Sequence, residues 1–176
     1  MRNPGKVIVA LMGAAALTMS ASVPAASSVV ERNDSFSIGV AAQHKAFRAH
    51  YGAEPLDLDP ELTRYATKRA QRMATADGAL SRSHGPYGEN LFMSWPNQPT
   101  PAEVVKAWMD GAAAYDYDNP GFSNATGNFT QVVWKGSRKL GVGLARSASD
   151  RWYVVAVYDP PGNYTGQFPQ NVGRYQ

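Results

Sequence analysis

The stretch Trp152-Tyr153-Val154-Val155-Ala156-Val157-Tyr158-Asp159 is apolar at nearly every position. Its length and its β-branched and aromatic residues favour a strand. Successive side chains of a strand point to opposite faces, so both faces of this strand are apolar. Such a sheet needs cover on both faces, and helices from the first half of the chain must supply it. The sequence therefore predicts an α+β fold, a three-layer α-β-α sandwich with a small antiparallel sheet.

Further strands are predicted on either side of the central loops, over Phe129–Trp134, Leu140–Ala145 and, more briefly, Gly88–Phe92. The links after the first two are short and polar, which favours antiparallel hairpins. Gly141 and Gly143 share one face of their strand. We expect them to let a helix approach that face closely.

Three helices are also predicted, two ahead of Gly88–Phe92 and one between that strand and Phe129–Trp134. Apolar side chains recur at a spacing near 3.6 over residues 36–51, and Gly52 ends that helix. Asp59-Pro60-Glu61 supplies an N-cap and a proline at the first position of a second helix, which Asp77-Gly78 stops. In Thr100-Pro101-Ala102-Glu103, the first and last residues form a capping box that opens the third helix.

The beginning of the chain has the pattern of a secretory signal. Arg2 and Lys6 are basic, Val7–Met19 is apolar or small, and small residues follow up to Ala26. We expect residues 1–25 to be removed and the protein to be secreted to the extracellular space. The apolar run is too short for a membrane span of about 20 residues, so an integral membrane protein is not expected.

The rest of the chain has the length of one domain, over residues 36–176, after a polar, flexible lead-in at residues 26–35. Loss of the signal lowers the formal net charge from +3 to +1. A nearly neutral domain has no general electrostatic reason to bind nucleic acid or an anionic membrane. We expect a monomer that folds without disulfides, since the chain has no cysteine. The cluster Arg64, Lys68, Arg69 and Arg72 is interpreted as one solvated helix face.

Four stretches, taken in order, resemble the CAP superfamily of cysteine-rich secretory proteins, antigen 5 and pathogenesis-related 1 proteins. They are His44–Gly52, Ser83-His84-Gly85 with Gly88–Leu91, Gly127–Ser137 and Tyr158–Tyr164. The resemblance implies an α-β-α sandwich over residues 36–176. It also implies a defence or host-interaction type of role. Many secreted eukaryotic members are rich in disulfides, and this chain departs from them.

The resemblance further implies a central cleft with two histidines and two acidic residues that help hold a divalent metal. His84 and Glu89 correspond to the first histidine and the first glutamate. Gly111 stands where the second glutamate is usual, and Asn128 where the second histidine is usual. Asp110 is a candidate to compensate for Gly111, although one step along a helix turns a side chain by about 100°.

Zinc normally needs three protein ligands for catalysis and four in a structural site. His84 and Glu89 alone are a poor zinc site, so no metal or other cofactor is predicted with them. In that interpretation, His84 donates to Glu89 or to a backbone carbonyl and makes the loop rigid. The alternative is a weak divalent cation, magnesium or calcium, held by Glu89, the Asn128 oxygen and water.

The leading functional hypothesis is a secreted, non-catalytic protein that binds a sterol, another lipid or a cell-surface ligand. The alternative is a metal-dependent hydrolase with a remodelled cleft. Several aromatic residues flank loops and either border a ligand groove or belong to the core: Phe92, Trp95, Tyr115, Tyr117, Phe122 and Phe168. Three Asn-x-Thr sequons would be glycosylated only in a eukaryotic secretory pathway: Asn124, Asn128 and Asn163.

Overall fold

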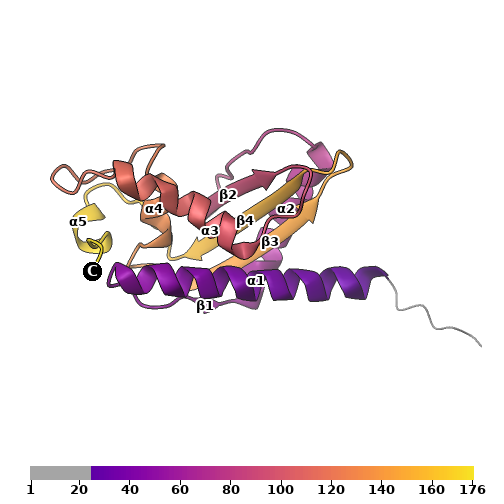
Figure 1. Cartoon of the computed structure of the whole chain (residues 1–176), viewed down its shortest axis with the longest axis horizontal. Helices are drawn as coiled ribbons and strands as arrows, with labels where there is room; N and C mark the ends of the chain where they lie inside the picture. The colour runs from indigo at the N-terminus through magenta and orange to yellow at the C-terminus, as the bar shows by residue number, and fades with distance from the viewer. Residues whose placement is uncertain (1–24) are drawn as a thin grey trace, which may run out of the picture.

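The computed structural model describes residues 25–176, with side chains from residue 33 onward. The predicted signal peptide therefore falls almost wholly outside the described residues. In chain order the elements are α1 (Ala25–His50), β1 (Asp57–Leu58), α2 (Pro60–Ala76), β2 (Gly88–Ser94), α3 (Pro101–Met109), the 3-10 helix η1 (Asp110–Ala114), α4 (Gly127–Val132), β3 (Lys139–Arg146), β4 (Trp152–Asp159) and α5 (Phe168–Asn171) (Figure 1).

The sheet has the strand order β1-β3-β4-β2. β4 lies in the middle and pairs antiparallel with both β2 and β3, which confirms the strands predicted around residues 88–92, 140–145 and 152–159. β1 pairs parallel with β3, but only opposite Lys139 and Leu140. Two residues carry no recognisable periodicity, so the sequence did not predict β1.

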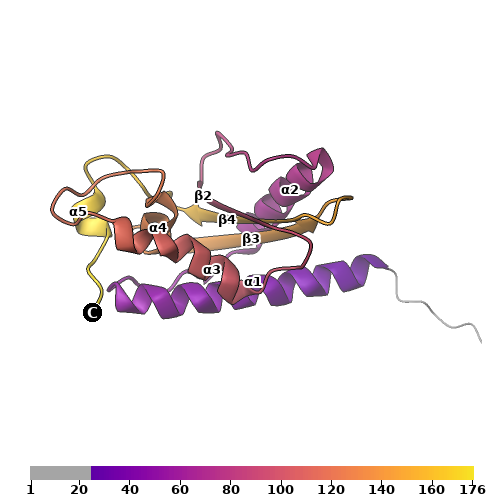
Figure 2. The same ribbon diagram turned by 45° about the horizontal axis from the view of Figure 1, so that its top comes forward.

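The two apolar faces of β4 are covered as predicted. Val154, Ala156 and Tyr158 belong to the larger core cluster, which lies beneath α1 and α3. Tyr153, Val155 and Val157 pack against the apolar stripe of α2. Seen along the sheet, α2 lies on one side and α1 with α3 on the other (Figure 2). The three-layer α-β-α sandwich is therefore confirmed.

Two glycines of β3 set how closely α2 lies on the sheet. A Cβ on Gly141 would lie 2.1 Å from the carbonyl carbon of Leu62, and one on Gly143 would lie 2.3 Å from that of Ala66. Real Cβ atoms do not approach backbone so closely, so both positions require glycine for this packing. At its start α2 is capped by Asp59, whose Oδ1 accepts from the backbone N–H of Leu62 at 3.0 Å.

The predicted strand over Phe129–Trp134 is wrong, because most of this stretch forms α4. Its β-branched and aromatic residues suit a strand. However, the edge of β3 at Lys139 and Leu140, where a further strand could pair, is already occupied by β1. The carbonyls of Val132 and Trp134 accept from Arg48 Nη1 at 2.7 and 3.0 Å. The ring of Phe129 packs edge-on against Tyr51. Tertiary packing therefore overrides the local strand preference.

The structure also continues α1 through residues 26–35, where we expected a flexible lead-in. Two residues directly after this part anchor the helix to the sheet. Phe36 is buried in the larger core cluster, and the Ser37 hydroxyl donates to Val142 O of β3 at 3.0 Å. Of the helices in the described part of the chain, none is both long and apolar enough to cross a bilayer.

Candidate functional site

Glu89 is the site residue with the most protein contacts. It lies near the start of β2, opposite Val157, and its side chain is 5% exposed on the α2 side of the sheet. Arg69 Nε donates to Glu89 Oε1 at 3.2 Å, and the backbone N–H of Ser83 donates to Oε2 at 2.8 Å. Both carboxylate oxygens therefore already have protein donors.

Arg69 does not belong to the solvated face to which the sequence analysis assigned it. Arg64, Lys68 and Arg72 are exposed, but the Arg69 side chain is only 12% exposed and is directed toward β2. Its Nη2 also donates to Ser81 O at 2.7 Å. Because helix periodicity alone cannot show a long side chain turning beneath its neighbours, this ion pair required the tertiary structure.

Arg82 connects Glu89 and Asn128, two of the positions that correspond to the family's cleft residues. It lies in the loop between α2 and β2, one residue ahead of Ser83. Its Nη1 donates to the backbone carbonyl of Glu89 at 2.5 Å, and its Nη2 donates to Asn128 Oδ1 of α4 at 3.3 Å. The amide oxygen that we considered as a cation ligand is therefore in contact with a guanidinium. The sequence analysis did not single out Arg82.

Gly111, where the family usually has its second glutamate, lies in η1 against the loop before α4. A Cβ at this position would lie 2.5 Å from the carbonyl oxygen of Ala125. No side chain fits there while that loop stays in place. Asp110 is exposed and pairs with Lys106 one turn earlier, at 3.2 Å. That contact on the exposed face of the helix uses the carboxylate we had considered as a replacement.

His84 is exposed and lies in the loop between α2 and β2, two residues after Arg82. We expected its ring to donate to Glu89 or to a backbone carbonyl. Among residues 33–176, the Glu89 carboxylate instead accepts from Arg69 and Ser83, and no hydrogen bond involves the His84 ring. The side chains that attach this loop to α2 and β2 are therefore Arg69, Arg82 and Glu89.

These residues do not fit a divalent metal. The Glu89 carboxylate is compensated by Arg69, the Asn128 oxygen accepts from Arg82, and Gly111 has no room for an acid. Two guanidinium groups beside one carboxylate also repel a cation. Across residues 33–176, no three histidine, aspartate or glutamate side chains come together in a way that could hold a metal ion.

A buried chain of hydrogen bonds runs from the backbone of Asn128 into the core. Asn90 Nδ2 donates to Asn128 O at 3.0 Å and to the Tyr158 hydroxyl oxygen at 3.2 Å. The Tyr158 oxygen lies 2.8 Å from His44 Nε2, and His44 Nδ1 lies 2.9 Å from Val40 O. Since a carbonyl can only accept, Nδ1 carries the proton and Tyr158 donates to Nε2. Burial lowers the pKa of His44 to about 4, which keeps the imidazole neutral.

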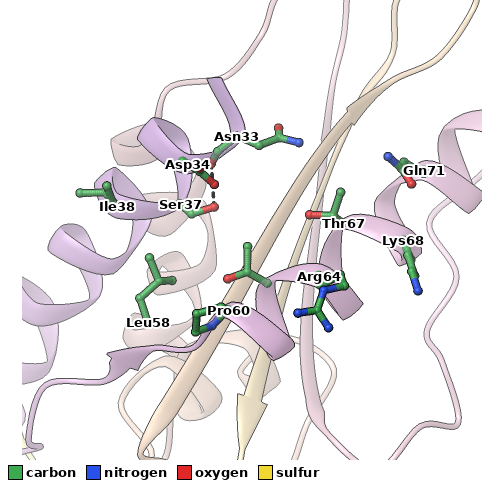
Figure 3. Close-up of a pocket in the computed structure, with 11 residues that line it drawn as sticks. Asn33, Asp34, Ser37, Ile38, Leu58, Pro60, Arg64, Thr67, Lys68 and Gln71 are labelled. Carbon is green, nitrogen blue, oxygen red and sulfur yellow. Dashed lines mark hydrogen bonds between the residues drawn. The ribbon is translucent and has the colours of Figure 1, made fainter. Parts of the chain in front are cut away.

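A further cavity lies away from these residues, between α1 and α2 beside β1. It has a volume of about 810 Å³. The cavity exists because α1 and α2 lie on opposite sides of the sheet, and β1, the edge strand between them, ends at Leu58 (Figure 2). Figure 3 shows side chains of both helices lining it. Ser37 Oγ lies 2.7 Å from Asn33 O, which shares the single hydroxyl hydrogen with Val142 O. We call this cavity the α1–α2 groove. The sequence analysis did not predict it. Its lining is Asn33, Asp34, Ser37, Ile38, Leu58, Pro60, Thr63, Arg64, Thr67, Lys68 and Gln71.

Comparison with known proteins agrees with this fold. The profile of the Cysteine-rich secretory protein family, CAP, matches residues 41–158. The basic form of pathogenesis-related protein 1 from Nicotiana tabacum is 40% identical over 127 residues, which cover 72% of this chain and 71% of that protein. Golgi-associated plant pathogenesis-related protein 1 from Homo sapiens is 36% identical over 134 residues, covering 73% and 86%.

Among solved structures, the crystal structure of NaASP2 with Zn2+ has a TM-score of 0.61 at 23% identity, over 82% of this chain and 87% of that one. At this identity the likeness concerns the fold. The family match over residues 41–158 contains His84, Glu89, Gly111 and Asn128. This chain belongs to the CAP family of cysteine-rich secretory proteins, although it has no cysteine.

Proposed function

We propose that this protein is a secreted, ligand-binding member of its family that acts without metal-dependent catalysis, and that its ligand is a small amphipathic lipid such as a fatty acid or a sterol. The observation that carries the proposal is the state of Glu89. A carboxylate that serves as a metal ligand or a general base needs a lone pair and an uncompensated negative charge near the reacting group. Both oxygens of Glu89 instead accept from Arg69 and Ser83.

The α1–α2 groove supports the choice of ligand. Its volume of about 810 Å³ lies within the range of roughly 300–1,000 Å³ that small-molecule sites occupy. Ile38, Leu58 and Pro60 supply an apolar surface, and Ile38 is 62% exposed. Hydroxyl, amide and basic groups and the carboxylate of Asp34 line the rest of the groove. One of the hydroxyls, Thr63 Oγ1, is buried and has no hydrogen-bond partner among residues 33–176. Such a lining suits a molecule with an alkyl body and a polar head.

Binding of a fluorescent fatty acid and of a labelled sterol tests the lipid ligand. We expect saturable, micromolar binding to the wild-type protein. Ile38→Glu should abolish it, because a carboxylate would then lie on the apolar part of the groove. Leu80→Glu is the matched control, since Leu80 is 40% exposed and does not line the groove. No saturable binding of either probe, or equal loss in both variants, would remove the groove as the lipid site.

Calorimetry with zinc tests the non-catalytic part of the proposal. The wild-type protein should bind zinc no more tightly than His84→Ala does. Micromolar binding that disappears in that variant would contradict the proposal. So would chelator-sensitive hydrolysis of peptides or esters that disappears in Glu89→Gln, since this result would favour the hydrolase. Mass spectrometry of the protein from culture medium tests secretion, with a new N-terminus at Ala26 or Ser27 as the expected result.

A further inference from the structure

Within residues 33–176, the charge of Arg82 has no acidic partner. Its two hydrogen bonds are to neutral oxygens, the carbonyl of Glu89 and the side-chain amide of Asn128. No carboxylate of residues 33–176 forms an ion pair with it, whereas Arg69 pairs with Glu89 at 3.2 Å. Two of the five N–H groups of the Arg82 guanidinium are used by these bonds, and the others have no protein acceptor among the same residues.

The local charge is therefore positive where a cation would be held in related proteins. Arg69 and Glu89 compensate each other in a largely buried ion pair, with side chains that are 12% and 5% exposed. Arg82 adds one positive charge at the exposed surface.

We propose that the guanidinium of Arg82, held between Glu89 and Asn128, binds an oxyanion, the phosphate or carboxylate group of a ligand. The planar fork of a guanidinium matches two oxygens of such a group. Because Asn128 Oδ1 accepts from Arg82, the Nδ2 donor of the same amide lies beside the guanidinium. The site is independent of the α1–α2 groove, since none of its residues lines that groove.

The contacts of Arg82 also place its charge firmly. An exposed arginine normally samples many rotamers, and ordering it on binding weakens affinity. Here β2 and α4 each accept one hydrogen bond from the guanidinium. The side chain of Arg82 is therefore already ordered in the folded protein, and little further conformational entropy is lost when a ligand binds. The site is open to solvent, so binding should be weak, in the millimolar range, and should weaken further with salt.

Titration with inorganic phosphate, followed by nuclear magnetic resonance, tests the proposal in the whole secreted chain. The side-chain amide signals of Asn128 and the Nε–H signal of Arg82 should shift and saturate together. Arg82→Gln should weaken binding at least about tenfold, since it removes a charge-assisted pair of hydrogen bonds. Arg72→Gln is the control. It removes an exposed arginine of α2 that makes no side-chain hydrogen bond within residues 33–176.

A second variant separates charge from loop structure. Asn128→Asp keeps an oxygen acceptor for Arg82, so the loop should stay in place and the melting temperature should not fall. It nevertheless cancels the charge of Arg82 and removes the amide donor, so phosphate binding should be lost. Phosphate binding that survives in Asn128→Asp or in Arg82→Gln would overturn the proposal.

Vesicles identify the source of the oxyanion. Phosphatidylcholine vesicles with and without phosphatidic acid are compared with free phosphate. Saturation by free phosphate indicates a small soluble ligand, whereas binding only to vesicles with phosphatidic acid indicates a lipid head group. Binding to neither refutes the oxyanion site. Failure here leaves the lipid groove intact, because Ile38→Glu leaves Arg82 unchanged and Asn128→Asp leaves the groove unchanged.

Discussion

Protonation of His44 should destabilise the protein as the pH falls below neutrality. His44 is fully buried on α1, where Nδ1 donates to Val40 O and Nε2 accepts from the Tyr158 hydroxyl. A second proton on the ring would need a new acceptor at Nε2, where another donor already points. Burial is the main cause of the lowered pKa, and the nearby charge of Arg48 lowers it further.

The size of the effect follows from the difference between the folded and unfolded states. In the unfolded chain the pKa of His44 lies near 6.5, and in the folded protein it lies at about 4. Between these two values the unfolded state binds more protons, so the free energy of unfolding decreases as the pH falls. A pKa difference of one unit corresponds to about 1.4 kcal/mol. The difference between 6.5 and about 4 therefore lowers the free energy of unfolding by about 3 kcal/mol in total between roughly pH 6.5 and pH 4. Above about pH 6.5 the histidine adds no pH dependence.

Urea unfolding at a series of pH values between about 7 and 4 measures this loss. His44→Gln replaces the ring with an amide whose oxygen can still accept from Tyr158, so most of the slope above about pH 4 should disappear. His50→Gln, a change of an exposed histidine on the same helix, should keep the wild-type slope. Parallel stability curves for the wild type and His44→Gln would refute the reasoning, because the slope would then arise from other groups.

Three further predictions concern packing and buried hydrogen bonds. Gly143→Ala should cost at least about 2 kcal/mol by urea unfolding, because its Cβ would lie 2.3 Å from backbone of α2. Gly121→Ala should be nearly neutral, because nothing lies within 4 Å of the added atom. Gly111→Glu restores the usual acid, but it should lower the melting temperature without creating zinc binding by calorimetry. Ala113→Glu, an exposed neighbour, should change neither quantity. Arg48→Met should cost about 3 to 5 kcal/mol in urea unfolding, since the buried guanidinium donates to four backbone carbonyls. A loss below about 1 kcal/mol would show that water replaces those bonds.

The layered fold followed from the sequence because strand and helix periodicities are local properties. The two apolar faces of Trp152–Asp159 required cover on both sides, and the caps at Asp59 and Thr100 marked where two of the helices begin. The same local preferences failed for Phe129–Trp134. That segment is surrounded by aromatic rings and the guanidinium of Arg48, and a helix satisfies those contacts better than a strand would.

The candidate site shows the opposite balance. From the sequence alone, His84, Glu89, Gly111 and Asn128 could be recognised as positions of a family cleft with two of its usual ligands replaced. Only the tertiary structure decided that Glu89 is already paired with Arg69, and that Arg82 reaches from a neighbouring loop to α4. The physical reason is that hydrogen bonds and charge compensation depend on distances between residues far apart in the chain. The composition and spacing of residues do not set those distances until the sheet and its helices bring the loops together.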